Sequence, residues 1–146
     1  METVAIGADH AGVALKDKLK EELVRKGFAV LDLGTNGDSS VDYPDYAQAV
    51  SQVIAQGEAQ KGVLVCGSGT GMAIAANRHP GIRAAACLDA ETARLARAHN
   101  DANVLCLGAR LMNEDEARKC LDAFLDTEFE GGRHVRRVEK LGRRPE

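Results

Sequence analysis

Short runs of apolar residues alternate along this sequence with longer segments in which apolar residues recur at helical spacing. The runs contain few charged residues, as expected for strands that are buried on both faces. Five such runs occur, at 3–8, 28–34, 62–66, 82–88 and 103–108. Strands that alternate with helices predict an α/β fold, in which a five-stranded parallel sheet carries helices on both faces.

Start and stop signals mark the helices between and after these strands. Pro44 suits a first helical turn, Asp89 is a predicted N-cap, and Gly27 is a predicted stop. Asn113 and Glu116 have the spacing of a capping box. The expected helices cover 13–26, 44–56, 71–78, 89–100, 113–125 and a C-terminal tail after 131–132.

The chain is long enough to form one domain with its own core. Its 146 residues contain no internal repeat, low-complexity tract or linker, so we expect a single domain over 1–146. The four cysteines form no Cys-x-x-Cys pair, and the N-terminal residues resemble neither a signal peptide nor a membrane span. These features favour a reduced, cytoplasmic protein without a membrane partner.

Positive charge is concentrated in the tail at 131–146. This segment holds six of the nineteen Lys and Arg residues but two of the twenty-two acids, a net charge of +4 that leaves −7 on the rest. Arg133 and Arg137 are four residues apart and share a helical face, which suits either solvent or a phosphate. Aromatic residues make up 3% of the chain and Trp is absent, so base-stacking platforms are lacking and nucleic acid is not favoured.

Several residues with reactive or polar side chains follow the predicted strands. Parallel sheets bind ligands at the carboxyl ends of their strands, so these residues are expected to share one cleft. Two more polar residues end the fourth predicted helix. The strand-end candidates are Asp9, His10, Cys66, Asp89 and Arg110, and the helix-end candidates are His99 and Asn100.

The stretch VLVCGSGTGM, at 63–72, places a cysteine between a predicted strand and a glycine-rich loop. Successive backbone N–H groups before a helix bind anions, so residues 67–71 are predicted to contact an oxygen anion. A dinucleotide-binding unit is the alternative, and Asp89 has the position of a ribose-binding acid. The pattern Gly-x-Gly-x-x-Gly would need glycine at Met72, however, so this match is weak.

Cys66 is the candidate base or nucleophile. A free cysteine is usually a small buried residue. Next to exposed amides and a helix N-terminus, however, a thiol is in an environment that favours the thiolate, which can act as a base. Cys87, Cys106 and Cys120 have no such loop and are expected in the core.

The four histidines have different surroundings in the sequence. His10 and His99 lie where a cleft is expected, and each suits a structural or a catalytic role. His79 is expected in a solvated turn, and His134 on the surface beside the tail arginines.

Six segments occur in a characteristic order: GADHAG, GTNGDSSVDYPDYA, VCGSGTGMAIAAN, GIRAAAC, AHNDANVLCLGAR and EGGRHVRRV. Over nearly the whole chain they resemble the sugar-phosphate isomerase family that contains ribose-5-phosphate isomerase B and the galactose-6-phosphate and allose-6-phosphate isomerases. The resemblance implies a three-layer Rossmann-like fold and reversible conversion of ribose 5-phosphate to ribulose 5-phosphate. It also implies a homodimer or tetramer with the site at the subunit interface, and no cofactor or metal.

The resemblance assigns roles to individual residues. Cys66 would be the base that moves a proton between C1 and C2 of the sugar, and His99 the acid that helps to open the sugar ring. The loop amides and the Ser68 hydroxyl would stabilise the enediolate oxygen. The substrate-binding residues would be Asp9, His10, Gly67, Ser68, Gly69, Thr70, Gly71, Asn100, Arg110, Arg133 and Arg137.

Three points qualify this assignment. Some family members lack the cysteine and use a glutamate at the position of Met72, so this chain resembles the cysteine type. An isomerase of a six-carbon sugar phosphate would share every motif above. A non-catalytic nucleotide-binding module is the alternative from another functional class.

Overall fold

Five parallel strands form one sheet in the computed structural model, which describes residues 1–143. Their order is β2-β1-β3-β5-β4, and every neighbouring pair is parallel, as the sequence predicts. The last three residues of the predicted tail, 144–146, lie outside the described residues. The strands are β1 (Thr3–Ala8), β2 (Ala29–Asp32), β3 (Lys61–Cys66), β4 (Ala84–Ala86) and β5 (Val104–Gly108).

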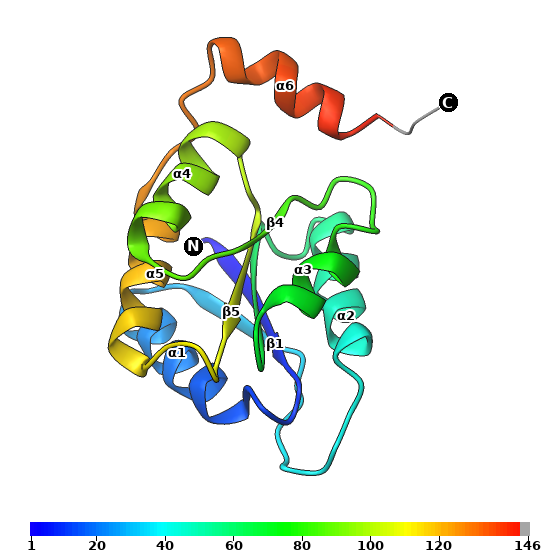
Figure 1. Cartoon of the computed structure of the whole chain (residues 1–146), viewed down its shortest axis with the longest axis vertical. Helices are drawn as coiled ribbons and strands as arrows, with labels where there is room; N and C mark the ends of the chain where they lie inside the picture. Colours follow the sequence, from blue (N-terminus) through cyan, green and yellow to red (C-terminus); the bar gives the residue numbers. More distant parts are fainter. Residues whose placement is uncertain (144–146) are drawn as a thin grey trace.

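Helices cover both faces of the sheet. Helices α1, α4 and α5 lie on one face and α2 and α3 on the other, with the sheet between them (Figure 1). This arrangement confirms the predicted three-layer α/β fold. The helices are α1 (Val13–Arg25), α2 (Tyr43–Ala55), α3 (Thr70–Ala76), α4 (Ala90–Asn100), α5 (Glu114–Asp126) and α6 (Arg133–Leu141).

The central strands are buried on both faces, which explains their unbroken apolar sequence. In β3, Val63 and Val65 face the core under α1, α4 and α5, whereas Leu64 faces the core under α2 and α3. All three are fully buried, and each such side chain contributes about 1.5–3 kcal/mol relative to an exposed one.

Capping boxes fix the starts of α4 and α5, as the sequence predicts. The Asp89 side chain accepts the Thr92 N–H at 2.8 Å, and the Asn113 side chain accepts the Glu116 N–H at 2.8 Å. The side chain of the third helical residue returns a bond to the cap residue in both helices. These caps satisfy backbone donors that a helix start otherwise leaves without partners.

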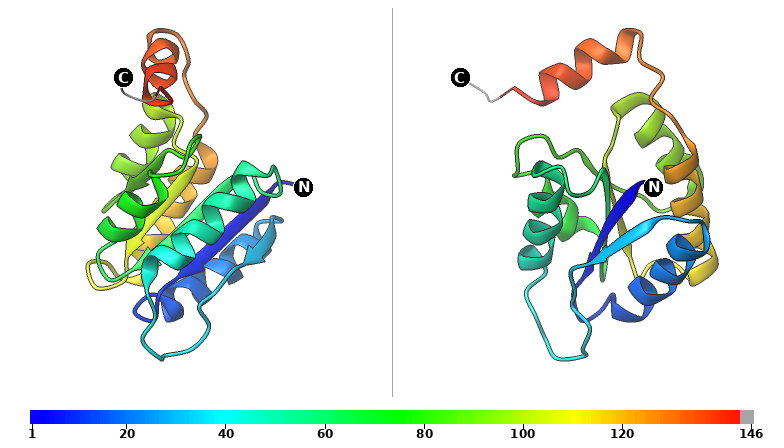
Figure 2. Two further views of the ribbon diagram at one scale, coloured as in Figure 1. Left: turned by 90° about the vertical axis from the view of Figure 1, so that its right-hand side faces the viewer. Right: turned by 180° about the vertical axis from the view of Figure 1, so that it is seen from behind.

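The parallel sheet has two different edges, which we call the carboxyl edge and the amino edge. All five strands end at the carboxyl edge, where the loops after β1 and β3 lie. Helix α6 packs against α4 at the opposite end of the molecule, far from the loop that joins β2 to α2 (Figures 1 and 2). Within residues 1–143, none of the helices has the length and apolar character needed to cross a bilayer.

Candidate active site

Two loops meet at the carboxyl edge where the strand order reverses. Strand β1 has β2 on one side and β3 on the other, so the loops after β1 and β3 flank a topological switch point, the usual ligand site in open α/β sheets. The Asp9 N–H donates to the Val65 carbonyl at 3.1 Å and joins the first loop to β3. The first loop carries Asp9 and His10, and the second carries Cys66 and residues 67–71.

Asp9 and His10 are each fixed by a hydrogen bond to the backbone. The buried Asp9 carboxylate accepts the Ala11 N–H at 3.0 Å. His10 Nδ1 accepts the Val41 N–H at 3.1 Å, which holds the loop before α2 against the site. Because Nδ1 is an acceptor here, a neutral His10 carries its proton on Nε2 and can donate it to a ligand.

The Cys66 thiol lies at the end of β3, almost covered by the loop that follows. The Gly69 N–H donates to Cys66 Sγ at 3.1 Å. This donor suits a thiolate, because an ionised acceptor forms the stronger hydrogen bond. Gly69 has a φ of +82°, a left-handed conformation that glycine adopts without steric cost, and this turns its N–H toward sulfur. The Ser68 hydroxyl accepts the Thr70 N–H at 3.3 Å.

Close backbone approach keeps the loop flat against β5. A side chain at Gly108 would place its Cβ 2.6 Å from the Ser68 backbone, so only glycine fits there. On the other side of the loop, the Tyr43 ring covers Gly71, where an added Cβ would lie 2.6 Å from the ring. Tyr43 is a site residue that the sequence reasoning missed, because its contact with the loop depends on how α2 packs beside α3.

Arg110 supplies the positive charge at this edge. Its backbone N–H donates to the Gly67 carbonyl at 3.0 Å, and its guanidinium lies beside Gly67, with Nη1 3.2 Å from the position of an added Cβ. The carboxyl edge therefore brings together most of the predicted site residues, namely Asp9, His10, Cys66, Gly67, Ser68, Gly69, Thr70, Gly71 and Arg110.

The remaining predicted residues lie at the amino edge. Helix α4 follows β4 and runs back to the start of β5, so His99 and Asn100 in its last turn are about 14–15 Å from its first residue. Arg133 and Arg137 are on α6, which packs against α4. One chain therefore does not bring His99, Asn100, Arg133 or Arg137 to Cys66, although the sequence interpretation placed His10 and His99 in one cleft.

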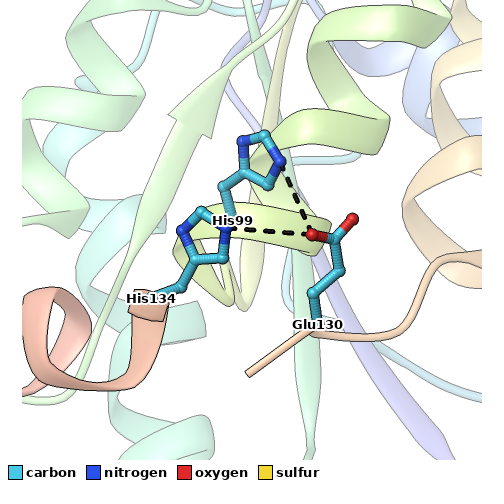
Figure 3. Close-up of side chains that lie close together, drawn as sticks. All are labelled: His99, Glu130 and His134. Carbon is cyan, nitrogen blue, oxygen red and sulfur yellow. Dashed lines mark ion pairs between the residues drawn. The ribbon is translucent and has the colours of Figure 1, made fainter. Parts of the chain in front are cut away.

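His99 stacks on a second histidine. Its ring lies 4.4 Å from that of His134, with 14° between the ring planes, and both Nε2 atoms are 3.8 Å from Glu130 Oε1 (Figure 3). His134 is buried, which corrects the expected surface position. Burial holds the pKa of His134 below its ordinary value, and the Arg133 charge adds to this effect.

The other three cysteines are in the core, as predicted. Cys87, Cys106 and Cys120 are all buried and none forms a disulfide. Burial raises the pKa of the Cys87 and Cys106 thiols and raises the pKa of Cys120 to about 11. These thiols therefore remain protonated near neutral pH.

A parallel sheet with a cysteine and an amide-rich loop at its switch point defines an α/β enzyme whose site is built by strand-end loops. The family model described as Ribose/Galactose Isomerase matches residues 4–141. The chain therefore belongs to the ribose/galactose isomerase family. Membership in this family favours an isomerase over the nucleotide-binding module.

Individual relatives resemble the chain over almost its full length. Ribose-5-phosphate isomerase B of Escherichia coli K12 is 44% identical over 97% of this chain and 95% of its own. A ribose 5-phosphate isomerase crystal structure from Thermotoga maritima is 52% identical with a TM-score of 0.94, over 97% of both chains. The Mycoplasma genitalium ribose-5-phosphate isomerase B, solved with bound ribulose-5-phosphate, is 44% identical with a TM-score of 0.91, over 96% of this chain and 93% of that one.

Proposed function

We propose that this protein interconverts ribose 5-phosphate and ribulose 5-phosphate through an enediolate. The observation that carries the proposal is the Cys66 thiol, held by the Gly69 N–H beside the amide-rich loop at the switch point. Two relatives support the choice of substrate, because the E. coli protein is named for this activity and the M. genitalium structure holds ribulose-5-phosphate.

Cys66 is the proposed base for proton transfer between carbons. In the open-chain aldose, the thiolate takes the proton from C2, and the electron pair forms the enediolate with negative charge on O1. The same group returns the proton to C1 while the O2 proton passes to O1, so the reaction has no net oxidation and needs no cofactor. The Ser68 hydroxyl and the loop amides that do not bind sulfur are the proposed donors to the enediolate oxygen.

The complete site requires two copies of the chain. Cys66 lies at the carboxyl edge, whereas His99 and the basic face of α6 lie at the amino edge. We therefore propose a homo-oligomer in which the amino edge of one copy meets the carboxyl edge of another. In this arrangement Arg133 and Arg137 bind the phosphate of a substrate whose reacting carbons contact the partner's Cys66.

The other site residues bind and open the sugar. His99 is the proposed acid for ring opening, because an imidazole can donate a proton near neutral pH. Asp9, His10, Asn100 and Arg110 are the proposed partners of the sugar hydroxyls. Phosphate binding far from the reacting carbons positions them for proton transfer.

A comparison of two substrates tests the proposed function. We expect kcat/KM for ribose 5-phosphate to exceed that for allose 6-phosphate by at least about 10-fold, the usual effect of one extra group in a fitted pocket. The opposite preference would assign the chain to six-carbon sugar phosphates. No turnover of either sugar by the assembled protein would contradict the proposal.

A further inference from the structure

The cluster of His99, Glu130 and His134 contains two residues that the proposed reaction does not use. We propose that these three side chains form a binding site for a divalent transition-metal ion of the zinc type, and that bound metal inhibits the isomerase. The metal site stands on geometry alone, whereas the inhibition rests on the proposed function of His99.

The ligand atoms lie close to one another. Each Nε2 atom is 3.8 Å from Glu130 Oε1, and one nitrogen or oxygen atom from each residue lies within 4.8 Å of the other two (Figure 3). A separation of 3.8 Å is too long for a hydrogen bond. It fits two ligands of one zinc ion, since zinc lies about 2 Å from each nitrogen or oxygen ligand.

His134 has a buried ring nitrogen without a hydrogen-bond partner among the described residues, and a metal ion would supply a partner. Its side chain is 9% exposed, and its buried Nε2 has no hydrogen-bond partner within residues 1–143. Buried polar atoms without partners are rare in folded proteins and each one is costly. Nε2 faces Glu130 (Figure 3), so a cation bound between them would complete its coordination.

The backbone holds the three residues in place independently of any ligand. The Glu130 N–H donates to the Ala98 carbonyl at 3.0 Å, which fixes the chain beside the last turn of α4. Gly131 and Gly132 then adopt positive φ values of 71° and 57°, and this bend starts α6 with His134 above His99. The ligands therefore come from the last turn of α4, from the segment before α6 and from the first turn of α6.

The ligand set selects the type of metal. Two imidazoles and one carboxylate suit zinc, cobalt, nickel or copper, whereas magnesium and calcium prefer oxygen ligands alone. Arg133 and Arg137 act electrostatically on His134 and oppose a cation, while the Glu130 carboxylate offsets part of this effect. We therefore expect reversible binding that is weaker than at a structural zinc site.

Bound metal would inhibit by occupying His99. A coordinated Nε2 has no proton to give to the sugar ring oxygen, so ring opening would lose its acid. Protein freed of metal by EDTA should consequently keep full activity, and added zinc should slow turnover of ribose 5-phosphate.

Direct binding and a spectroscopic probe test the site. We expect one Zn²⁺ per chain in competition with a chromophoric chelator, using the EDTA-treated full chain. Glu130→Gln and His134→Gln should each weaken binding at least about 10-fold, because even loss of an outer-shell partner has this effect. His79→Gln, which removes a histidine outside the cluster, is the control and should bind like the wild type. Bound Co²⁺ should show ligand-field absorption without a thiolate-to-cobalt band.

Each outcome decides one part of the proposal. Absence of binding, or binding that persists in Glu130→Gln and is lost in Cys66→Ser with a thiolate band in the wild type, would overturn the site. Glu130 is exposed, so this variant remains informative if His134→Gln fails to fold. Binding at the cluster without inhibition would overturn the inhibition alone. An EDTA-treated protein with no isomerase activity would instead contradict the proposed function and leave the metal site intact.

Discussion

At the scale of single residues, the proposed proton transfer depends on one thiol among four. Cys66→Ala removes the proposed base but leaves the loop and the arginines in place, so we expect substrate binding to persist while kcat falls by roughly 10²–10⁴-fold. Exchange of the C2 proton of ribose 5-phosphate with deuterated solvent, followed by NMR, measures this step directly. Exchange at near wild-type rate in the variant would mean that another residue is the base.

Chemical modification tests the reactivity of the Cys66 thiol independently. Iodoacetamide should modify Cys66 ahead of the other three, because burial raises the pKa of Cys87, Cys106 and Cys120. A substrate analogue should protect the protein, and Cys66→Ser should regain little activity because a hydroxyl ionises far less readily than a thiol.

His99 should affect ring opening more than carbon-proton transfer. We expect His99→Asn to lose most activity on ribose 5-phosphate, which is mostly cyclic, and much less on ribulose 5-phosphate, whose aldose product can be released open and close in solution. Values of kcat at saturating substrate in both directions measure the difference, because the equilibrium constant fixes the ratio of the two kcat/KM values in any variant. Equal losses of kcat in both directions would argue against this role.

Residue positions were predictable from sequence where they depend on one strand end. Cys66 and Arg110 lie at the carboxyl edge because Cys66 ends β3 and Arg110 comes two residues after β5, and the order of the elements is enough to place them. The burial of His134 was not predictable, because it depends on a bend at Gly131 and Gly132 and on stacking with His99 across that bend. The spacing of residues in the tail does not indicate this contact between His134 and His99.

At the scale of elements, a buried lysine joins α1 to β2 and to the following loop. Lys16 is fully buried, and its Nζ donates to Asp32 Oδ1 at 2.8 Å and to Asn36 Oδ1 at 2.6 Å. Lys16→Met should lower the free energy of unfolding by roughly 3 kcal/mol, because it leaves the largely buried Asp32 carboxylate with the Lys20 ammonium and the Gly34 N–H as its remaining partners within residues 1–143. Urea unfolding measures this change.

A matched double variant distinguishes the charge from the packing. Lys16→Met combined with Asp32→Leu removes both charges, so we expect it to recover much of the lost stability. If the double variant were less stable than Lys16→Met, the remaining hydrogen bonds of Asp32 would stabilise the fold by more than its unpaired charge destabilises it.

The strands were easier to predict than their ends. The run at 82–88 contains only three strand residues, Ala84–Ala86, because β4 is an edge strand that pairs with β5 alone. Both a side chain and the backbone hold the residue before it, since the Arg83 N–H donates to the Asn103 side chain at 2.8 Å and the Arg83 carbonyl accepts the Asn103 N–H at 2.9 Å. Apolar composition indicates burial, whereas pairing partners decide where a strand stops.

At the scale of the whole molecule, the proposed composite site can be tested by mixing two inactive variants. Cys66→Ala and Arg137→Ala should each be impaired alone. After subunit exchange, some hybrid assemblies would carry both defects in one site and leave another site intact, so activity should return. Activity assays on exchanged mixtures measure this recovery. No recovery after verified exchange would argue that all these residues act within one chain.

Within one chain, Cys66 and the arginines lie at opposite edges of the sheet. This separation also affects how the isomerisation rate depends on the protein concentration. On the proposed arrangement an isolated chain has no turnover, so at low protein concentration the rate grows with the square of concentration rather than in proportion to it. Halving the supply of protein near the dissociation constant of the assembly would therefore remove more than half of the flux. The affinity between subunits thus sets a threshold below which a cell that makes the protein has almost no enzyme.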